Sequence, residues 1–183
     1  MSGTVLLTGG SGGLGLSVAR ALAGAGYGLV LVGRRDEPLR AAARELGARA
    51  IPWNVSRDPE ALIAIAAPVD HLVHCASARP ETPVEGWTAE DFRRAQDLFV
   101  TGPALLSRAF AAEAPERQDR AVVFVSPALS PERGYTPWYA ARAAAVALAV
   151  SLGAELGLRC EGVLGAEDPG AEVLRILRAQ ESG

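Results

Sequence analysis

A glycine-rich stretch near the N-terminus carries the clearest chemistry in this sequence. It reads Thr8-Gly9-Gly10-Ser11-Gly12-Gly13-Leu14-Gly15, and it lies between the apolar run 5–7 and an Ala/Leu-rich segment, 17–25, with helical spacing. Glycines lack a Cβ, so the backbone can approach a pyrophosphate, and the first N–H groups of a helix point toward such an anion. The order of strand, glycine turn and helix therefore predicts a site for nucleotide phosphates.

The glycines fit three spacings of this kind of turn. Gly10-x-Gly12-x-x-Gly15 is the general dinucleotide fingerprint. Thr8-Gly9-x-x-Gly12-x-x-Gly15 and Thr8-Gly9-x-x-x-Gly13-x-Gly15 also fit, because positions 12 and 13 are both glycine. The glycines alone leave the register open.

Short apolar runs alternate with helical patterns along the rest of the chain. Strands are predicted at 5–7, 28–32, 48–53, 69–75, 121–125 and 159–164, and helices near 14–25, 38–46, 58–66, 88–113, 138–156 and 170–180. Pro103 is expected to start or kink the later half of 88–113. This alternation predicts a single α/β domain over 1–183: a Rossmann-like, doubly wound parallel sheet of about six strands in the order 3-2-1-4-5-6, flanked by helices. Ligands of such sheets bind beyond the carboxyl ends of the strands.

The second strand ends in Val32-Gly33-Arg34-Arg35-Asp36. In dinucleotide folds an acidic residue here accepts from the ribose 2′-hydroxyl, whereas arginine holds a 2′-phosphate. Gly33 stands where the acid is expected, and the guanidinium of Arg34 suits phosphate oxygens. Asp36 follows too late to be the ribose ligand. We therefore expect NADP(H) in preference to NAD(H), the alternative being that Arg34 and Arg35 are only solvated loop charges.

Composition limits the kinds of partner. A net charge of −3 and a pI near 5.5 give no reason to expect nucleic acid or an anionic membrane. No apolar run reads as a membrane span or a leader peptide, and Cys75 and Cys160 read as reduced core residues, so a cytoplasmic protein is expected. All 18 basic residues are arginine, and the sequence has no lysine.

From residue 4 to about 164 the sequence resembles the short-chain dehydrogenase/reductase family. The last of the three glycine spacings is the one found in that family. Asn54-Val55 follows the third strand where members usually carry Asp-Val, and only Ala76 survives of their Asn-Asn-Ala-Gly after the fourth strand. Asn54 either accepts from the adenine amine or caps the next turn. His74 is either a site histidine or a core imidazole with one hydrogen bond; no metal site is indicated.

The resemblance implies a cofactor site built from the glycine turn and from the ends of the second, third and fourth strands. The residues expected to bind the cofactor are Gly9, Ser11, Gly13, Leu14, Gly15, Arg34, Arg35, Asn54, Val55, Cys75 and Ala76.

The resemblance also implies catalytic residues. Ser126 ends the fifth strand, and Tyr139 follows 13 residues later, a spacing typical of the family's Ser and Tyr. In that chemistry the serine polarises a carbonyl, the tyrosine transfers a proton, and a lysine in Tyr-x-x-x-Lys lowers the tyrosine pKa. Counted back from Ser151, Arg142 falls on the lysine position and Trp138 on the tyrosine position. Two registers therefore compete for the tyrosine position.

Other parts of the family pattern are lost. Phe99 stands at the position of an asparagine that holds a water in the proton relay, and an arginine cannot pass a proton on. After the sixth strand the link is too short for a substrate lid, and a seventh strand is not expected. The family also implies a homodimer or tetramer through the helices at 88–113 and 138–156.

Two functions remain open at this point. The first is NADP(H)-dependent oxidoreduction of a small carbonyl or alcohol substrate by Ser126, Tyr139 and Arg142. The second is a non-catalytic NADP-binding regulatory or interaction protein. The loss of the relay asparagine, of the lysine and of the substrate lid would suit such a protein.

Overall fold

A computed structural model describes residues 3–78, 80–114, 116–117, 119–129 and 132–181. Its centre is a six-stranded sheet in the order β3-β2-β1-β4-β5-β6, with every neighbouring pair parallel. The strands are β1 (Thr4–Thr8), β2 (Gly28–Gly33), β3 (Arg49–Pro52), β4 (His71–His74), β5 (Ala121–Ser126) and β6 (Arg159–Leu164). The predicted fold class and strand order are confirmed.

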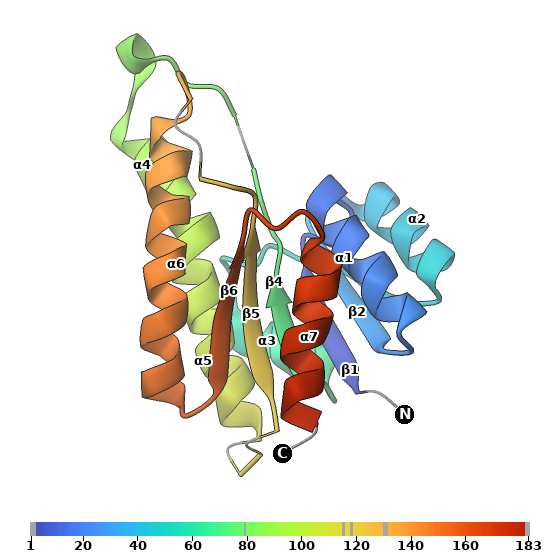
Figure 1. The fold of residues 1–183 in the computed structure, drawn as a ribbon. Coiled ribbons are helices and arrows are strands. Elements are labelled where there is room, and N and C mark those ends of the chain that lie inside the picture. Colours follow the sequence, from blue (N-terminus) through green and yellow to red (C-terminus); the bar gives the residue numbers. More distant parts are fainter. Residues whose placement is uncertain (1–2, 79, 115, 118, 130–131, 182–183) are drawn as a thin grey trace.

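Helices cover both faces of the sheet and make a three-layered domain (Figure 1). Their bounds are α1 (Gly13–Gly24), α2 (Asp36–Leu46), α3 (Pro59–Ala66), α4 (Ala89–Gln96), α5 (Gly102–Glu113), α6 (Thr136–Leu156) and α7 (Pro169–Glu181). Side chains of α1, α2 and α7 pack in the hydrophobic cluster on one face. Those of α3, α5 and α6 pack in the cluster on the other face. The strands are thus buried from both sides.

The centre of β1 shows why this strand has consecutive apolar residues and not an alternation of apolar and polar ones. Leu6 and Leu7 point to opposite faces of the sheet, and each is fully buried in the cluster on its own side. Truncating either to alanine would cost about 2–5 kcal/mol of stability, because the cluster on that side loses packed methyl groups. A parallel sheet covered on both faces requires this kind of strand.

The segment predicted as one helix at 88–113 is divided by a π-helical turn, η2 (Asp97–Thr101). Thr88 caps α4 by a reciprocal pair of hydrogen bonds with Asp91. At the start of α5, a Cβ on Gly102 would lie 2.7 Å from the carbonyl oxygen of Asp97 and 3.0 Å from that of Val55. Pro103 is in the first turn of α5, where its missing N–H costs nothing. The division places Leu98 and Phe99 toward the carboxyl end of the sheet.

Helix α6 is long and apolar enough to cross a membrane, judged by length and composition alone. The sequence was expected to hold no run of this kind, but the core helix of a soluble protein meets the same criterion. Here α6 packs along β5, β6, α4, α5 and η2, and it carries Arg142 in its second turn. Its place in the fold is that of a helix flanking the sheet.

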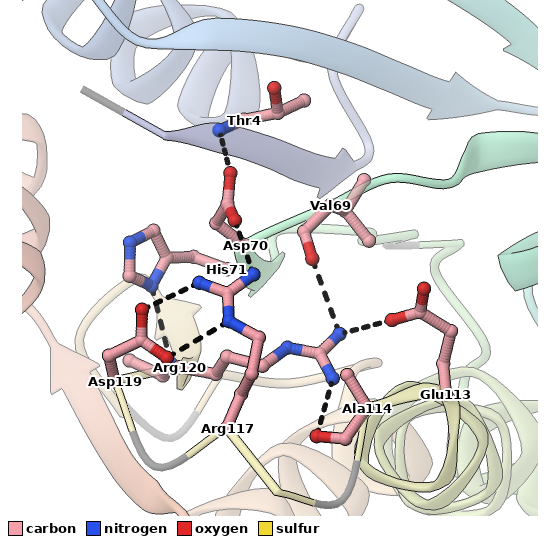
Figure 2. A network of polar contacts seen from close by, with 10 residues as sticks. Thr4, Val69, Asp70, His71, Glu113, Ala114, Arg117, Asp119 and Arg120 are labelled. Carbon is pink, nitrogen blue, oxygen red and sulfur yellow. Dashed lines mark hydrogen bonds and ion pairs between the residues drawn. The ribbon is translucent and has the colours of Figure 1, made fainter. Parts of the chain in front are cut away.

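Two arginines tie together the amino ends of the central strands (Figure 2). Asp70, just before β4, accepts from the backbone N–H of Thr4 at 2.6 Å and from Nη1 of Arg117 at 2.6 Å. Arg117 also donates through Nε and Nη2 to both carboxylate oxygens of Asp119, at 3.0 and 2.6 Å. One guanidinium therefore lies between two carboxylates.

The second arginine, Arg120, is fully buried before β5. Its Nη2 donates to Oε2 of Glu113 at 3.0 Å and to the carbonyl oxygen of Val69 at 3.3 Å. The guanidinium carbon lies 3.6 Å from the ring centroid of Phe110, close enough for a cation–π contact. A carboxylate, a carbonyl and an aromatic face together compensate the burial of this charge.

Candidate functional site

An open cleft of about 500 Å³ lies at the carboxyl ends of β1, β2, β3 and β4. It is the edge where the sequence predicted a ligand. The cleft is lined by Gly9, Ser11, Gly12, Gly13, Leu14, Gly15, Gly33, Arg34, Arg35, Trp53, Asn54, Val55, Cys75, Ala76, Ser77, Ala78, Leu98 and Pro127. Every residue predicted to bind the cofactor is in this lining.

The glycine turn has the shape that a phosphate site requires. Gly9 has φ +75°, and a Cβ there would lie 2.6 Å from the carbonyl oxygen of Cys75. A Cβ on Gly15 would overlap the carbonyl oxygen of Gly9. Around Gly13, in contrast, no atom lies within 4 Å of where a Cβ would be. The first two glycines are therefore needed by the fold, while the third faces open space.

The N-terminus of α1 faces the cleft. Its first helical hydrogen bond runs from the N–H of Leu16 to the carbonyl oxygen of Gly12 at 2.7 Å. The N–H groups of Gly13, Leu14 and Gly15 precede that bond, so the helix itself gives them no partner. These donors and the helix dipole together favour an anion in the cleft.

The Thr8 side chain fixes the floor of the cleft. This fully buried hydroxyl accepts from the N–H groups of Cys75 and Ala76, both at 3.2 Å. The ends of β1 and β4 are thereby held together beneath the glycine turn. Cys75 is itself buried, and burial raises the pKa of its thiol far above the ordinary range. Burial thus favours the uncharged thiol, which lines the cleft beside Ala76.

Two cations border the cleft where β2 ends. Arg34 and Arg35 are exposed. Among the residues that the structure describes, neither side chain forms an ion pair or a hydrogen bond. Asp36, next in sequence, instead accepts from Nε of Arg40 at 2.6 Å on the surface of α2. The lining of the cleft contains no acidic residue. The site is therefore electropositive at this end.

The segment after β3 supplies one wall of the cleft. Oδ1 of Asn54 accepts from the N–H of Ser56 at 3.2 Å, and Asp58, rather than Asn54, caps α3. The Asn54 acceptor is thus already used in a local turn. Nε1 of Trp53 donates to the carbonyl oxygen of Arg57 at 2.8 Å, which fixes the indole at the cleft. We did not predict Trp53, although an aromatic residue at the carboxyl end of a strand was the available signal.

The predicted catalytic residues lie outside the lining of this cleft. Ser126 and Arg142 line a small cavity of about 30 Å³ between the sheet, α5 and α6, which shares Ala76 and Leu98 with the lining of the cleft. Nε of Arg142 donates to Oγ of Ser126 at 3.1 Å, and its Nη2 donates to the carbonyl oxygens of Pro127 and Ala128 at 2.8 and 3.1 Å. Tyr139, three residues before Arg142 on the same helix, lines neither cavity. The structure therefore joins two of the three residues.

Trp138 is the other candidate for the tyrosine position. It is only 5% exposed and packs edge-to-face on Phe99, with ring centroids 6.4 Å apart. Both lie in a small apolar cluster with Ala95 and Ala141. The indole Nε1 is buried, with no hydrogen-bond partner among the described residues. In the register counted back from Ser151, the positions of the family's tyrosine and relay asparagine are thus filled by two aromatic rings that pack on each other.

His74 is a core imidazole in this structure. Its Nε2 lies 3.0 Å from Oγ of Ser107, and its ring packs on Phe124 with centroids 4.6 Å apart. Burial lowers the pKa of His74 to about 3, so the ring is neutral at physiological pH. The hydrogen bond ties β4 to α5, and of the two interpretations the structure agrees with the core one.

Fold, glycine turn and cleft together define a dinucleotide-binding α/β domain. A family profile described as short chain dehydrogenase matches residues 3–160. The chain therefore belongs to the short-chain dehydrogenase/reductase family, whose members bind NAD(P) and generally act on small molecules.

Known relatives are similar over most of this chain. A short chain dehydrogenase of Pseudocercospora fijiensis is 33% identical over 168 residues, which are 84% of this chain and 54% of that protein. The human dehydrogenase/reductase SDR family member 4 is 29% identical over 84% of this chain and 60% of its own length. This chain thus spans about half to three fifths of these two relatives.

One solved structure is similar in both fold and sequence. It is an NADPH-bound short chain oxidoreductase from Pseudomonas aeruginosa PAO1, described as containing an atypical catalytic center. Its TM-score is 0.77 at 28% identity, with 88% of this chain and 70% of that chain covered.

Proposed function

We propose that this protein binds NADP(H), with the 2′-phosphate held by Arg34 and Arg35. The observation that carries the proposal is the pair of unneutralised guanidinium groups beside the glycine turn, in a cleft whose lining has no carboxylate. The similar P. aeruginosa protein was solved with NADPH, which supports the same ligand here. When bound, the nicotinamide would supply or accept a hydride.

The residues present fit the adenosine and pyrophosphate parts of this cofactor. The open space at Gly13 and the first N–H groups of α1 suit the pyrophosphate. The indole of Trp53 offers an apolar wall beside Arg34 for the adenine. Gly33 removes the repulsion that a carboxylate would exert on a 2′-phosphate.

Replacing Arg34 by alanine tests the phosphate assignment. We expect the affinity for NADPH to fall about 10–100-fold, and that for NADH to change by less than about threefold, because only NADPH carries the 2′-phosphate. Isothermal titration calorimetry measures both. Arg108→Ala is the matched control: it removes the same charge from an exposed pair with Glu60, on α5 and α3. Equal losses for NADPH and NADH would contradict the assignment.

A second candidate function is oxidoreduction of a small carbonyl or alcohol substrate. The hydrogen bond between Arg142 and Ser126 favours it, since a serine at the end of β5 keeps the position that polarises a carbonyl in the family. In this candidate Tyr139 transfers the proton to or from the substrate oxygen. Turnover of aldehydes and ketones, followed by nicotinamide absorbance, tests the candidate. Activity that survives Tyr139→Phe would refute the role of Tyr139.

We also propose that two or four copies associate through α4, α5 and α6. Val150 on α6 is 75% exposed and Leu105 on α5 is 38% exposed, so both helices present apolar side chains outward. Light scattering after size-exclusion chromatography should show a dimer or tetramer. Val150→Glu should shift it toward monomer, because a carboxylate would be buried at the interface. A monomeric parent protein would refute this proposal.

A further inference from the structure

The lining of the cleft does not include the residues that chemistry at the nicotinamide would need. Its lining includes Leu98 and Pro127, and it shares Ala76 and Leu98 with the small cavity at α6. Ser126 precedes Pro127 by one residue, yet it lines the other cavity with Arg142. The lining therefore provides cationic, aromatic and backbone N–H groups for one half of a dinucleotide, and mainly apolar and small side chains for the other.

Arg142 is committed to its own chain. Its guanidinium donates to the Ser126 hydroxyl and to two carbonyl oxygens of the connection between β5 and α6. These bonds hold the connection against α6, so the arginine acts as a clamp on the backbone. A lysine at this position would reach out with a single ammonium group, whereas the fork of the guanidinium spans several acceptors at once.

The chain after β6 does not reach the cleft either. The N–H of Gly165 donates to the carbonyl oxygen of Ser126 at 3.0 Å, and a Cβ on Gly165 would lie 2.9 Å from that of Ala128. Asp168 then accepts from the N–H of Ala171 at 2.9 Å, in the first turn of α7. The turn from β6 into α7 is short and packed, and none of residues 165–168 lines the cleft.

We propose that this site recognises the 2′-phospho-ADP half of NADP(H) and gains no affinity from the nicotinamide half. The inference rests on the proposed binding of NADP(H) and specifies what is bound. Affinity comes from the cationic pair, the glycine turn and the Trp53 wall. With Trp138 and Phe99 packed on each other and Arg142 clamped to the loop, no described side chain distinguishes an oxidised from a reduced nicotinamide.

Titration calorimetry with ligand fragments tests the inference. NADP⁺, NADPH and 2′-phospho-ADP-ribose should bind with dissociation constants within about threefold of one another, which is less than 1 kcal/mol. Nicotinamide mononucleotide should show no binding. ADP-ribose should bind about 10–100-fold more weakly than its 2′-phosphorylated form, because it lacks the group that Arg34 and Arg35 hold.

The outcomes separate this inference from the proposed function. If NADP⁺ or NADPH binds more than about tenfold more tightly than 2′-phospho-ADP-ribose, the nicotinamide half is recognised and the inference is overturned, while NADP(H) binding stands. If none of the three ligands binds, the proposed function fails.

A variant adds a second readout that does not depend on absolute affinity. Arg34→Ala should lower the affinities for NADP⁺, NADPH and 2′-phospho-ADP-ribose by the same factor. It should leave the affinity for ADP-ribose unchanged. The Arg108→Ala control should leave all four affinities unchanged. Unequal factors for NADPH and 2′-phospho-ADP-ribose would show coupling to the nicotinamide end and would contradict the inference.

Discussion

At the amino ends of β1, β4 and β5, arginines lie against carboxylates; at the carboxyl ends, arginines face an open cleft. Arg117 is held between Asp70 and Asp119, and Arg120 is buried against Glu113 (Figure 2). Arg34 and Arg35 have no acidic neighbour in the cleft lining. Arginines that are paired with carboxylates of the same chain stabilise the fold. Arginines that lie exposed beside the glycine turn are available to a ligand. Substitutions at the two ends should therefore separate stability from binding.

The largest effect is expected from Arg120→Ala at the amino ends. It removes a fully buried charge from Glu113 and from the Phe110 ring, so we expect a loss of about 3–5 kcal/mol in the free energy of unfolding. Urea denaturation measures it. Arg120→Met, which keeps much of the side-chain volume, should lose less, and Arg108→Ala should lose less than about 1 kcal/mol. A loss for Arg120→Ala no larger than that of Arg108→Ala would contradict the structural role of this end.

Gly13→Asp should break binding at the carboxyl ends without harming the fold. Space around Gly13 is open, and an acidic residue in the first turn stabilises a helix by about 0.3–1 kcal/mol. The same carboxylate would face the pyrophosphate, so we expect at least about a 100-fold loss of NADPH affinity with an unchanged or higher melting temperature. Gly13→Ala is the uncharged control and should lose less affinity. A lowered melting temperature would mean that the residue is needed by the fold.

Asp70 gives the amino-end network a pH dependence. Burial alone would raise the pKa of Asp70, but hydrogen bonds from Thr4 and Arg117 outweigh it and hold the pKa below its usual range. A carboxyl pKa that is lowered in the folded state contributes stability at neutral pH, and this is lost as pH falls below about 4. Asp70→Asn should therefore cost about 1–2 kcal/mol at pH 7.

The pH profile supplies the control for that prediction. The stability difference between Asp70→Asn and the parent protein should shrink as pH falls through the acid range, while NADPH affinity at neutral pH stays the same. A difference that is constant with pH would show that packing, rather than the ionised carboxylate, stabilises this end.

The smallest effect on affinity is expected from Trp53→Phe. Phenylalanine keeps an aromatic wall, so NADPH affinity should change by less than about threefold. The quenching of tryptophan fluorescence by NADPH should nevertheless fall strongly, because Trp53 is the tryptophan that lines the cleft. Trp87→Phe, on the segment that precedes α4 and outside the cleft lining, should keep the quenching. The reverse pattern would place the nucleotide elsewhere.

The two ends of the sheet differ in how much of them the sequence predicts. At the carboxyl ends the glycine turn, Arg34 and the residues after β4 were predicted, because a strand followed by glycines and a helix is a local pattern. At the amino ends nothing was predicted for Asp70, Arg117 or Arg120. Their partners are up to 66 residues away in sequence. No local spacing signals such contacts.

By itself, the sequence determined the order of strands and helices and the place of the glycine turn, and it predicts the loss of the family's relay residues. These follow from hydrophobic period, from glycine positions and from residue identity. Only the tertiary structure decided where the side chains of α6 point. One turn of helix separates Trp138 from Arg142, and packing against Phe99 and the end of β5 sets which of them is buried and which clamps the loop. Those choices depend on contacts between distant segments, which exist only once the sheet and its helices have assembled.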